Sequence, residues 1–314
     1  MDLILKGILN SHHPETLKGQ LIEKKLIPAA SQPITPEGCH MVFTTSWDFS
    51  VNGDSEFTQD IGMKVFKAWA YYNKSTLAEF LVPQNLLNYM MDINAKNKAR
   101  LIKLIHYSLE MLWETENFKS LCHIVQTQSV TCLLENKELS VLVAFTELFR
   151  YIPQCVPMGD LTSKLCIAII HCLANIRVPD QSNEMGGFIF DISKVCNFLQ
   201  TIWNSSESSV QKTLETMYFL LQQDTKDCSP VLAAVVEALP LQLLHEVVPL
   251  LLKDKSADKG LTLVVGRMLD WLYWPKAINI SSWILTVLKG MASSKKFSLL
   301  MIIFEAKIEQ VCIA

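Results

Sequence analysis

Glycine is scarce in this sequence: 11 of the 314 residues are glycine, about half of the average usage near 7%. The glycine-rich signatures of dinucleotide-binding and phosphate-binding loops are absent, as are the G-x-S-x-G and H-E-x-x-H signatures of hydrolases. The glycine pair in "EMGGF", at 184–188, is expected in a loop and does not resemble a phosphate cradle. These absences argue against the common nucleotide-binding and hydrolytic enzymes, and no cofactor is predicted.

An excess of charge of one sign is also lacking. The chain has 28 basic and 31 acidic residues, a net charge of −3. Proteins that bind nucleic acid or anionic lipid usually carry a basic patch or stripe. We therefore expect a mixed, solvated surface and neither a nucleic-acid partner nor a membrane partner.

An uninterrupted hydrophobic run long enough to cross a membrane is missing too. The most apolar stretch, 229–254, contains titratable residues and prolines: Glu237, Pro240, His245, Glu246 and Pro249. A spanning helix needs about 20 predominantly apolar residues, so two helices buried in protein fit this stretch better. The N-terminal stretch 1–18 lacks the basic segment and cleavage site of a signal peptide.

The nine cysteines do not form a secreted disulfide framework, since their number is odd and the chain is long. Five of them lie inside apolar helical stretches: Cys122, Cys132, Cys166, Cys172 and Cys196. A free cysteine in such a place behaves as a small buried hydrophobe. This usage predicts a reducing compartment, the cytoplasm or the nucleus.

Neither a metal site nor a catalytic cysteine is predicted. Cys166, His171 and Cys172 lie in one apolar helical stretch, and no second ligand pair with zinc spacing follows. The adjacent pairs Cys39-His40 and Cys122-His123 point in different directions on a helix or a strand. Core packing is therefore the favoured role of these residues, and no catalytic, cofactor-binding or metal-binding residue is assigned.

Apolar residues recur with helical spacing almost throughout. Three clear stripes are Ile61, Val65, Trp69 and Tyr72; Val141, Ala144, Phe145, Leu148 and Ile152; and Phe297, Leu300, Met301, Phe304, Ile308 and Val311. Spacings of three and four residues over three turns are typical of amphipathic helices. Residues 39–51 are the most strand-like, but helix is at least as well supported there. The expected class is all-α.

Proline, glycine and polar clusters divide the chain into helices of ordinary length with short connections. About eight pairs of helices would average about 39 residues, close to the 40 to 47 of HEAT and armadillo repeats. We therefore expect an α-solenoid of antiparallel helix pairs, a single elongated domain over 1–314. A hinge or long loop is expected at 179–187, which contains Pro179 and the glycine pair.

Three of the seven tryptophans, Trp271, Trp274 and Trp283, fall within thirteen positions. Trp271 and Trp274 share one side of a helix that Pro275 interrupts, and Trp283 begins the apolar stripe of the next helix. Large aromatic residues on facing stripes are most simply core. An exposed peptide-binding groove and a membrane belt are the less favoured alternatives.

The last expected helix, from Lys296 to about Val311, is apolar over more than the arc of about 100° that a surface helix buries. Leu299, Ile302 and Ile303 widen its stripe. An uncovered apolar patch usually marks an interaction surface or an aggregation liability. These three residues are therefore the candidate interaction surface, through which the chain self-associates or binds a partner.

Several stretches resemble the N-terminal helical region of the ubiquitin carboxyl-terminal hydrolases of the 35 and 38 type. They are "MDLILKGILNSHHPETLK", "YIPQCVPMGDLTSKLC", "ISKVCNFLQTIW", "ALPLQLLHEVV" and "RMLDWLYWPKAINISSWILTVLKGMASSKKFSLLMIIFEAKIEQV". The resemblance is specific from about 260 to 311, moderate from 145 to 250 and loose from 35 to 140. It covers only the non-catalytic region of that family.

The resemblance implies a cytoplasmic or nuclear protein from a family that removes ubiquitin with a cysteine nucleophile. The family's "GNTCY"-type and "GHY"-type boxes are absent here, so no catalytic role transfers to any residue. The chain ends at "KIEQVCIA", where the helical region is expected to continue, which fits a truncated or spliced form, a shortened relative or a fragment.

Three hypotheses about function remain at this point. The first is a non-catalytic scaffold that brings substrates or regulators to ubiquitin removal. The second is a stand-alone helical adaptor with no link to ubiquitin. The third is a chain that itself hydrolyses ubiquitin.

The core assignment of the tryptophans is testable by substitution. Trp271→Ala or Trp283→Ala should each lower the free energy of unfolding by roughly 3–5 kcal/mol, because each removes a large buried side chain. Chemical denaturation measures the effect. If the variants unfold at the same denaturant concentration as the wild type and lose only the binding of a partner, the tryptophans lie in an exposed groove instead.

Overall fold

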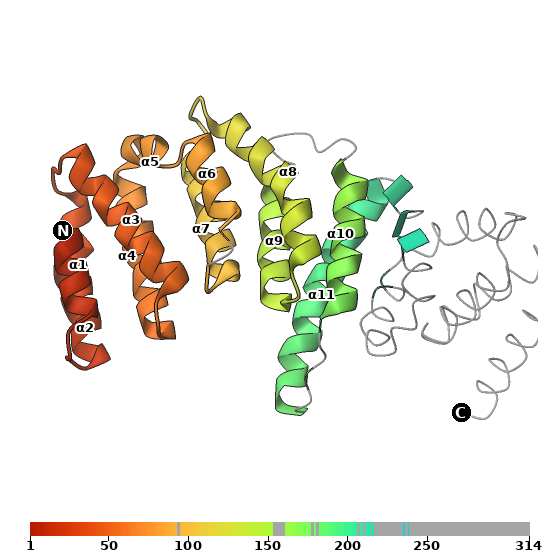
Figure 1. Ribbon diagram of the computed structural model, residues 1–314, viewed down its shortest axis with the longest axis horizontal. Helices are drawn as coiled ribbons and strands as arrows, with labels where there is room; N and C mark the ends of the chain where they lie inside the picture. Colours follow the sequence, from red (N-terminus) through yellow and green to blue (C-terminus); the bar gives the residue numbers. More distant parts are fainter. Residues whose placement is uncertain are drawn as a thin grey trace, which may run out of the picture. The chain divides into compact units, whose positions relative to one another are not determined.

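The computed structural model describes residues 1–92, 95–152, 161–176, 179 and 182–205, and the positions 208–209, 212–213, 215–216, 235 and 238. The α-helices within it (Figure 1) are α1 Asp2–Leu9, α2 Glu15–Leu21, α3 Pro36–Asn52, α4 Glu56–Tyr72, α5 Lys74–Phe80, α6 Pro83–Met90, α7 Lys98–Met111, α8 Phe118–Glu135, α9 Leu139–Tyr151, α10 Leu161–Asn175 and α11 Ser182–Ser205. A π-helical segment, η1 Ile22–Leu26, and a 3-10 helix, η2 Pro28–Ser31, follow α2. These residues include no strand, so the all-α prediction is confirmed for the described part of the chain.

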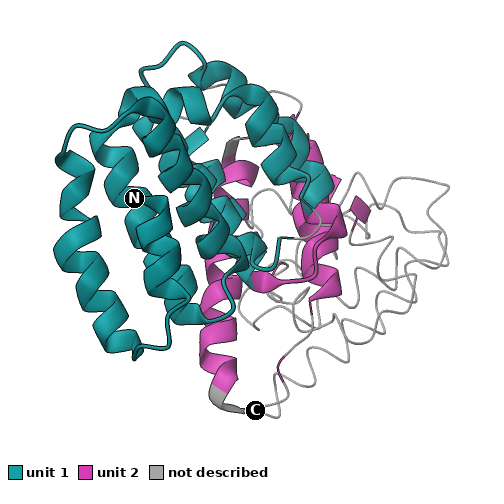
Figure 2. Ribbon diagram, turned by 60° about the vertical axis from the view of Figure 1, so that its left-hand side comes forward, with its two compact units in different colours: residues 1–132, 140–158 teal, residues 133–139, 159–314 magenta. Residues whose placement is uncertain are grey.

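Contacts group the chain into two compact units (Figure 2). Unit 1 comprises residues 1–132 and 140–158, and unit 2 comprises residues 133–139 and 159–314. Within unit 1, α3 packs against α1, α4, α5 and α7, and α4 also packs against α7. The expected single domain over 1–314 stays a prediction.

Helix α3 occupies the stretch that is most strand-like in sequence. Its N-cap residue Thr35 accepts a hydrogen bond from the Gly38 N–H at 3.2 Å, and Pro36 takes the first helical position. Both features favour a helix start. Ser55 and Asn97 cap α4 and α7 in the same way. The caps explain why α3 is helical despite its threonines and valines.

The apolar stripes predicted in the middle of the chain are buried. Ile61, Val65 and Trp69 of α4 are at most 3% exposed. All five residues of the second predicted stripe are buried, four on α9 and Ile152 directly after it: Val141, Ala144, Phe145, Leu148 and Ile152. Tyr72 differs, with 57% of its surface exposed. It is the last residue of α4.

Helices α3 and α4 approach each other closely at Gly62. A Cβ atom added to this glycine would lie 2.5 Å from the Ser50 backbone nitrogen and 2.8 Å from the Ser46 carbonyl oxygen. Ser46 and Ser50 are completely buried. Glycine in the middle of a helix costs about 0.5–1 kcal/mol relative to alanine, so the close approach of the two backbones explains its presence here.

The helices begin at regular intervals along the chain. After α4 begins at residue 56, α7 begins at 98, α8 at 118, α9 at 139, α10 at 161 and α11 at 182. From α7 on, each helix therefore starts 20 to 22 residues after the one before it. The longer interval between α4 and α7 holds the two short helices α5 and α6.

Part of the stretch 179–187, expected as a hinge or long loop, is helical. Helix α11 begins at Ser182 and continues through Gly186 and Gly187. A Cβ at either glycine would meet no atom within 4 Å, so this pair does not mark a close approach of two backbones. A long loop is therefore wrong for residues 182–187, while a hinge stays a prediction.

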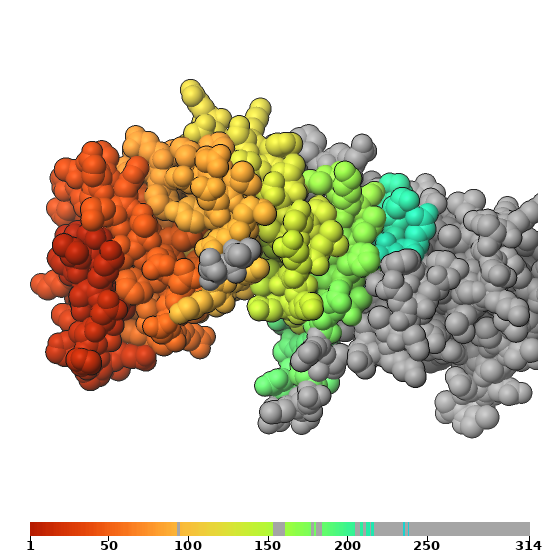
Figure 3. Space-filling model, in the orientation of Figure 1, coloured from red at the N-terminus to blue at the C-terminus, as the bar shows by residue number. Residues whose placement is uncertain are grey.

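The C-terminal predictions lie outside the described residues. This applies to the predicted core residues Trp271, Trp274 and Trp283 and to the candidate surface residues Leu299, Ile302 and Ile303. At the opposite end of the sequence, α1 covers one end of unit 1 (Figure 3). Its inner side chains Leu5 and Leu9 are buried, whereas Leu3 is 73% exposed.

The close approach at Gly62 generates a stability prediction. Gly62→Ala should lower the free energy of unfolding by about 1–3 kcal/mol, because the new methyl group forces α3 and α4 apart. Gly7→Ala is the matched control, since Gly7 is exposed in α1 with no atom near the added Cβ. The control should raise stability by up to about 1 kcal/mol. Urea denaturation measures the free energy of unfolding of both variants. An equal change in the two would contradict a close approach of α3 and α4 at Gly62.

Candidate functional site

Aromatic side chains form the core of unit 1 around α3. The ring of Phe43 lies 5.5 Å from Phe66 of α4 and 5.4 Å from Phe80 of α5, measured between centroids. Trp47 meets Phe66 edge-on at 5.4 Å. Such tilted and edge-to-face pairs are favourable beyond the area that they bury. They fix α3 against α4 and α5.

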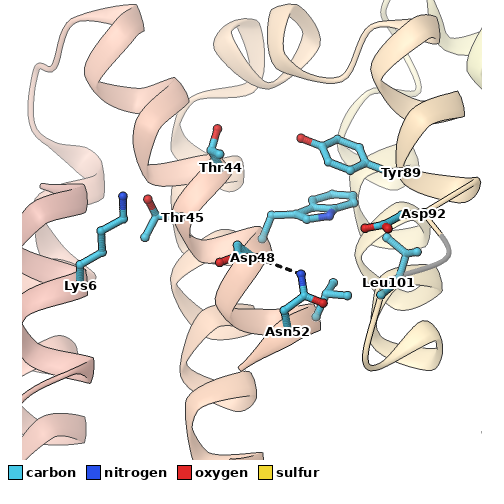
Figure 4. Close-up of a pocket in the computed structure, with 11 residues that line it drawn as sticks. Lys6, Thr44, Thr45, Asp48, Asn52, Tyr89, Asp92 and Leu101 are labelled. Atoms are coloured by element: carbon cyan, nitrogen blue, oxygen red, sulfur yellow. Dashed lines mark hydrogen bonds between the residues drawn. The ribbon is translucent and has the colours of Figure 1, made fainter. Parts of the chain in front are cut away.

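The aromatic core ends in a stacked pair beside a cavity. Trp47 of α3 and Tyr89 of α6 stack with ring centroids 4.5 Å apart. The cavity next to them has a volume of about 290 Å³ (Figure 4). It is lined by Lys6, Thr44, Thr45, Trp47, Asp48, Val51, Asn52, Tyr89, Asp92, Ala95 and Leu101. These residues come from α1, α3, α6, α7 and the connection before α7.

The connection between α6 and α7 is held against α3 by polar contacts. The Asn52 side-chain oxygen accepts from the Lys96 backbone N–H at 3.1 Å, and the Asn97 N–H donates to the Val51 carbonyl at 3.1 Å. The Asn52 amide nitrogen donates to Asp48 Oδ1 at 2.9 Å. These contacts fix the wall of the cavity that follows α6.

The charged groups of the cavity are two carboxylates and one ammonium. Asp48 belongs to α3 and Asp92 follows α6, and Figure 4 shows Lys6 on the α1 side of the cavity. Lys6 Nζ lies 3.8 Å from Asp2 Oδ2 on its own helix. Burial raises the pKa of the Tyr89 hydroxyl, so this group stays neutral at physiological pH. The lining therefore has a net negative charge.

Four of the buried thiols in the described part of the chain are not activated. Burial raises the pKa of Cys39 and of Cys172 to about 11, and that of Cys196 to about 12. It also raises the pKa of Cys166 to about 12, against hydrogen bonds with Ser209 and Thr213 that lower it. A reactive cysteine requires a lowered pKa. None of these four groups is a nucleophile at neutral pH.

The two cysteines weighed as metal ligands, Cys166 and Cys172, have other partners. Cys166 contacts Ser209 and Thr213, and the Cys172 sulfur accepts from the Asn136 amide at 3.6 Å. Within the described ranges, no three histidine, cysteine or acidic side chains gather as a metal site would require. In the same part of the chain, no helix is long and apolar enough to cross a membrane. Cys122 is buried as predicted, and Cys132 is only half-buried.

Sequence reasoning missed the cavity. Asp48, Tyr89 and Asp92 lie up to 44 residues apart, and none belongs to a motif. The available signal was the run "TTSWD" on α3, which places a tryptophan beside an acid and three hydroxyl side chains. That run reveals a site only once α6 and the segment after it are known to lie opposite.

Comparisons with known proteins identify the region. Residues 49–313 match the family described as "Ubiquitin carboxyl-terminal hydrolase 38-like, N-terminal domain". The chain is also 26% identical over 314 residues to the human protein "Ubiquitin carboxyl-terminal hydrolase 35". That alignment covers 99% of this chain and 31% of the relative, so the chain spans less than a third of the relative's length. The resemblance found in the sequence is confirmed.

The raised thiol pKa values predict low reactivity. Cys39, Cys166, Cys172 and Cys196 should resist iodoacetamide at neutral pH in the folded chain, because less than about one in a thousand of these thiols is ionised there. Cys132 is the internal reference, since it is the half-buried thiol of the same chain. Peptide mapping by mass spectrometry reads the modification. Labelling of any of the four as fast as Cys132 would contradict the assignment, and all should react in denaturant.

Proposed function

Because the chain belongs to the family of ubiquitin carboxyl-terminal hydrolase 38-like N-terminal domains, we propose that it is a non-catalytic helical-repeat scaffold for protein binding in ubiquitin removal. The chain corresponds to the N-terminal region of these hydrolases and not to their catalytic domain. A scaffold of this kind would hold ubiquitinated substrates or regulators near the enzyme. Cytoplasm and nucleus are its proposed compartments.

The repeat architecture is supported first by the helix starts. Helices α4, α7, α9 and α11 begin at residues 56, 98, 139 and 182, which are 41 to 43 residues apart. Helices α8 and α10 begin at 118 and 161, also 43 apart. Pairs of helices with a period of 40 to 47 residues are typical of HEAT and armadillo repeats. We therefore assign α4, α7, α9 and α11 as the second helices of successive pairs.

The long-range polar contacts support the same period. They join Glu23–Lys64, Ala30–Asn73, Asn52–Lys96, Asp54–Lys96, Gln59–Asn97, Asp60–Arg100, Lys67–Tyr107, Met90–Cys132, Leu109–Tyr151, Asn136–Cys172, Ser163–Ser208, Ser163–Ser209 and Gln200–Ala238. The partners in these contacts are 36 to 46 residues apart. In a solenoid each repeat touches only its neighbours, so one recurring separation is expected. This is the observation that carries the proposal.

Polar contacts join α4 directly to α7, the second helices of two neighbouring pairs. Asp60 of α4 pairs with Arg100 of α7 at 2.6 Å. Further along the same two helices, the Tyr107 hydroxyl donates to the Lys67 carbonyl at 3.1 Å and the Lys67 ammonium lies 5.1 Å from the Tyr107 ring centroid. Such contacts fix the register of one pair on the next and leave a row of polar side chains at the surface. Stacked repeats typically use an extended surface of this kind to bind other proteins.

The proposal has a biochemical test in two arms. A ubiquitin-vinyl-sulfone probe should leave all nine cysteines of the purified chain unmodified, since none of them lies in a segment that resembles the cysteine box of the hydrolase family, and burial raises the pKa of four of them. Affinity purification of the chain from cell extract should enrich ubiquitin conjugates or a ubiquitin hydrolase. Lys103→Glu, which reverses an exposed charge on α7, should reduce that enrichment, whereas Glu37→Gln on the first turn of α3 should not.

Each arm has an outcome that contradicts the proposal. A specific ubiquitin adduct on any cysteine would make the chain a hydrolase. Enrichment of proteins without ubiquitin conjugates or hydrolases would instead indicate a stand-alone adaptor.

A further inference from the structure

We propose that the cavity beside Trp47 and Tyr89 binds the guanidinium group of an arginine side chain presented by a partner protein. The inference rests on the proposed function, because it names the chemistry of one contact that a protein-binding scaffold would make. The proposed ligand is an arginine side chain, and the site in unit 1 that would bind it needs no contact with ubiquitin.

The size of the cavity suits one side chain. Its volume of about 290 Å³ lies at the lower limit of the ~300–1,000 Å³ found for small-molecule sites. The cavity is lined from α1, α3 and the segment around α6 and α7, all within unit 1. A long, unbranched side chain entering from a partner is therefore a better match than a cofactor-sized ligand.

The charges of the cavity favour a cation. Asp48 and Asp92 contribute carboxylates from two different segments of the chain (Figure 4). Lys6 contributes the opposing charge, but its ammonium is 3.8 Å from Asp2 and half of its side-chain surface is exposed. A cation that enters the cavity is therefore attracted by both carboxylates, and Asp48 Oδ1 also accepts a hydrogen bond from the Asn52 amide at 2.9 Å.

The aromatic pair favours arginine over lysine. Trp47 is almost completely buried behind Tyr89, and Tyr89 is only half-buried. A guanidinium is planar and weakly hydrated, and it stacks on aromatic rings while its N–H groups reach carboxylates. An ammonium is strongly hydrated and lacks that planar match. The stacked pair beside two carboxylates thus offers arginine both of its preferred contacts.

Two walls of the cavity are joined by hydrogen bonds. Contacts from Asn52 to Lys96 and from Asn97 to Val51 hold the connection after α6 on α3. Arg100 of α7 is itself anchored by Asp60 at 2.6 Å. Little ordering is then required on binding, which preserves affinity for a single side chain.

The test uses blocked amino acids as probes of the full chain. N-acetyl-arginine methylamide should bind weakly, and the lysine, norleucine and glutamate analogues should bind less well or not at all, as measured by saturation-transfer NMR titration. Asp48→Asn should weaken arginine binding about tenfold, because a charge-assisted hydrogen bond is lost. Lys6→Gln should strengthen it about twofold to fivefold by removing a like charge.

Glu37→Gln is the matched control, since Glu37 is an exposed carboxylate on the same helix α3 but outside the cavity. It should leave arginine binding unchanged. Tyr89→Leu provides a second variant if Asp48→Asn alters the circular dichroism spectrum, and it should also weaken binding. High salt should reduce affinity, because the interaction is between charges.

Four results would overturn the proposal: no binding of the arginine analogue, equal binding of the lysine analogue, preferred binding of the glutamate analogue, or equal losses in Asp48→Asn and Glu37→Gln. Failure of this test leaves the scaffold function standing, because co-purification with ubiquitin conjugates is measured independently. Loss of that co-purification together with intact arginine binding would instead separate the cavity from ubiquitin removal.

Discussion

The structure depends on the burial of each helix's apolar stripe against the helices beside it. Isolated helices shorter than about 12–15 residues are marginal in water, and several helices here are that short. Helix α4 illustrates the constraint: Val65, Phe66 and Trp69 are completely buried, in a helix that packs against both α3 and α7. The stability of α4 therefore depends on the helices that it packs against.

Polar contacts then determine how α7 is aligned along α4. A net hydrogen bond contributes about 0.5–1.5 kcal/mol, which is small beside the burial of a Trp69 or a Phe43. These polar contacts determine the register of the two helices instead. The Asp60–Arg100 pair and the Tyr107–Lys67 bond form only when α7 lies at one offset along α4. The same alignment brings the segment after α6 opposite α3 and thereby creates the cavity at Trp47. The candidate site is therefore a consequence of how α6 and α7 are aligned with α3 and α4.

The sequence predicted what periodicity and local chemistry control. The helical class and the buried stripe of α9 are both confirmed, because spacing alone determines which side of a helix is apolar. The position of Tyr72 could not be predicted, since its exposure depends on where neighbouring helices stop. Gly62 and the cavity were also beyond sequence reasoning: the first needs the distance between two backbones, and the second joins Asp48 to residues 41 and 44 positions away. The core position of Trp271 and the surface position of Leu299 stay predictions.

The central claim is that helix pairs repeat every 41 to 43 residues and stack as a solenoid. Small-angle X-ray scattering of the monomer, separated by size-exclusion chromatography, tests it most directly. A compact globular protein of 314 residues has a radius of gyration of about 20 Å. The account predicts a clearly larger radius and a pair-distance distribution with a long tail. A radius near ~20 Å with a symmetric distribution would contradict the stacked-repeat architecture.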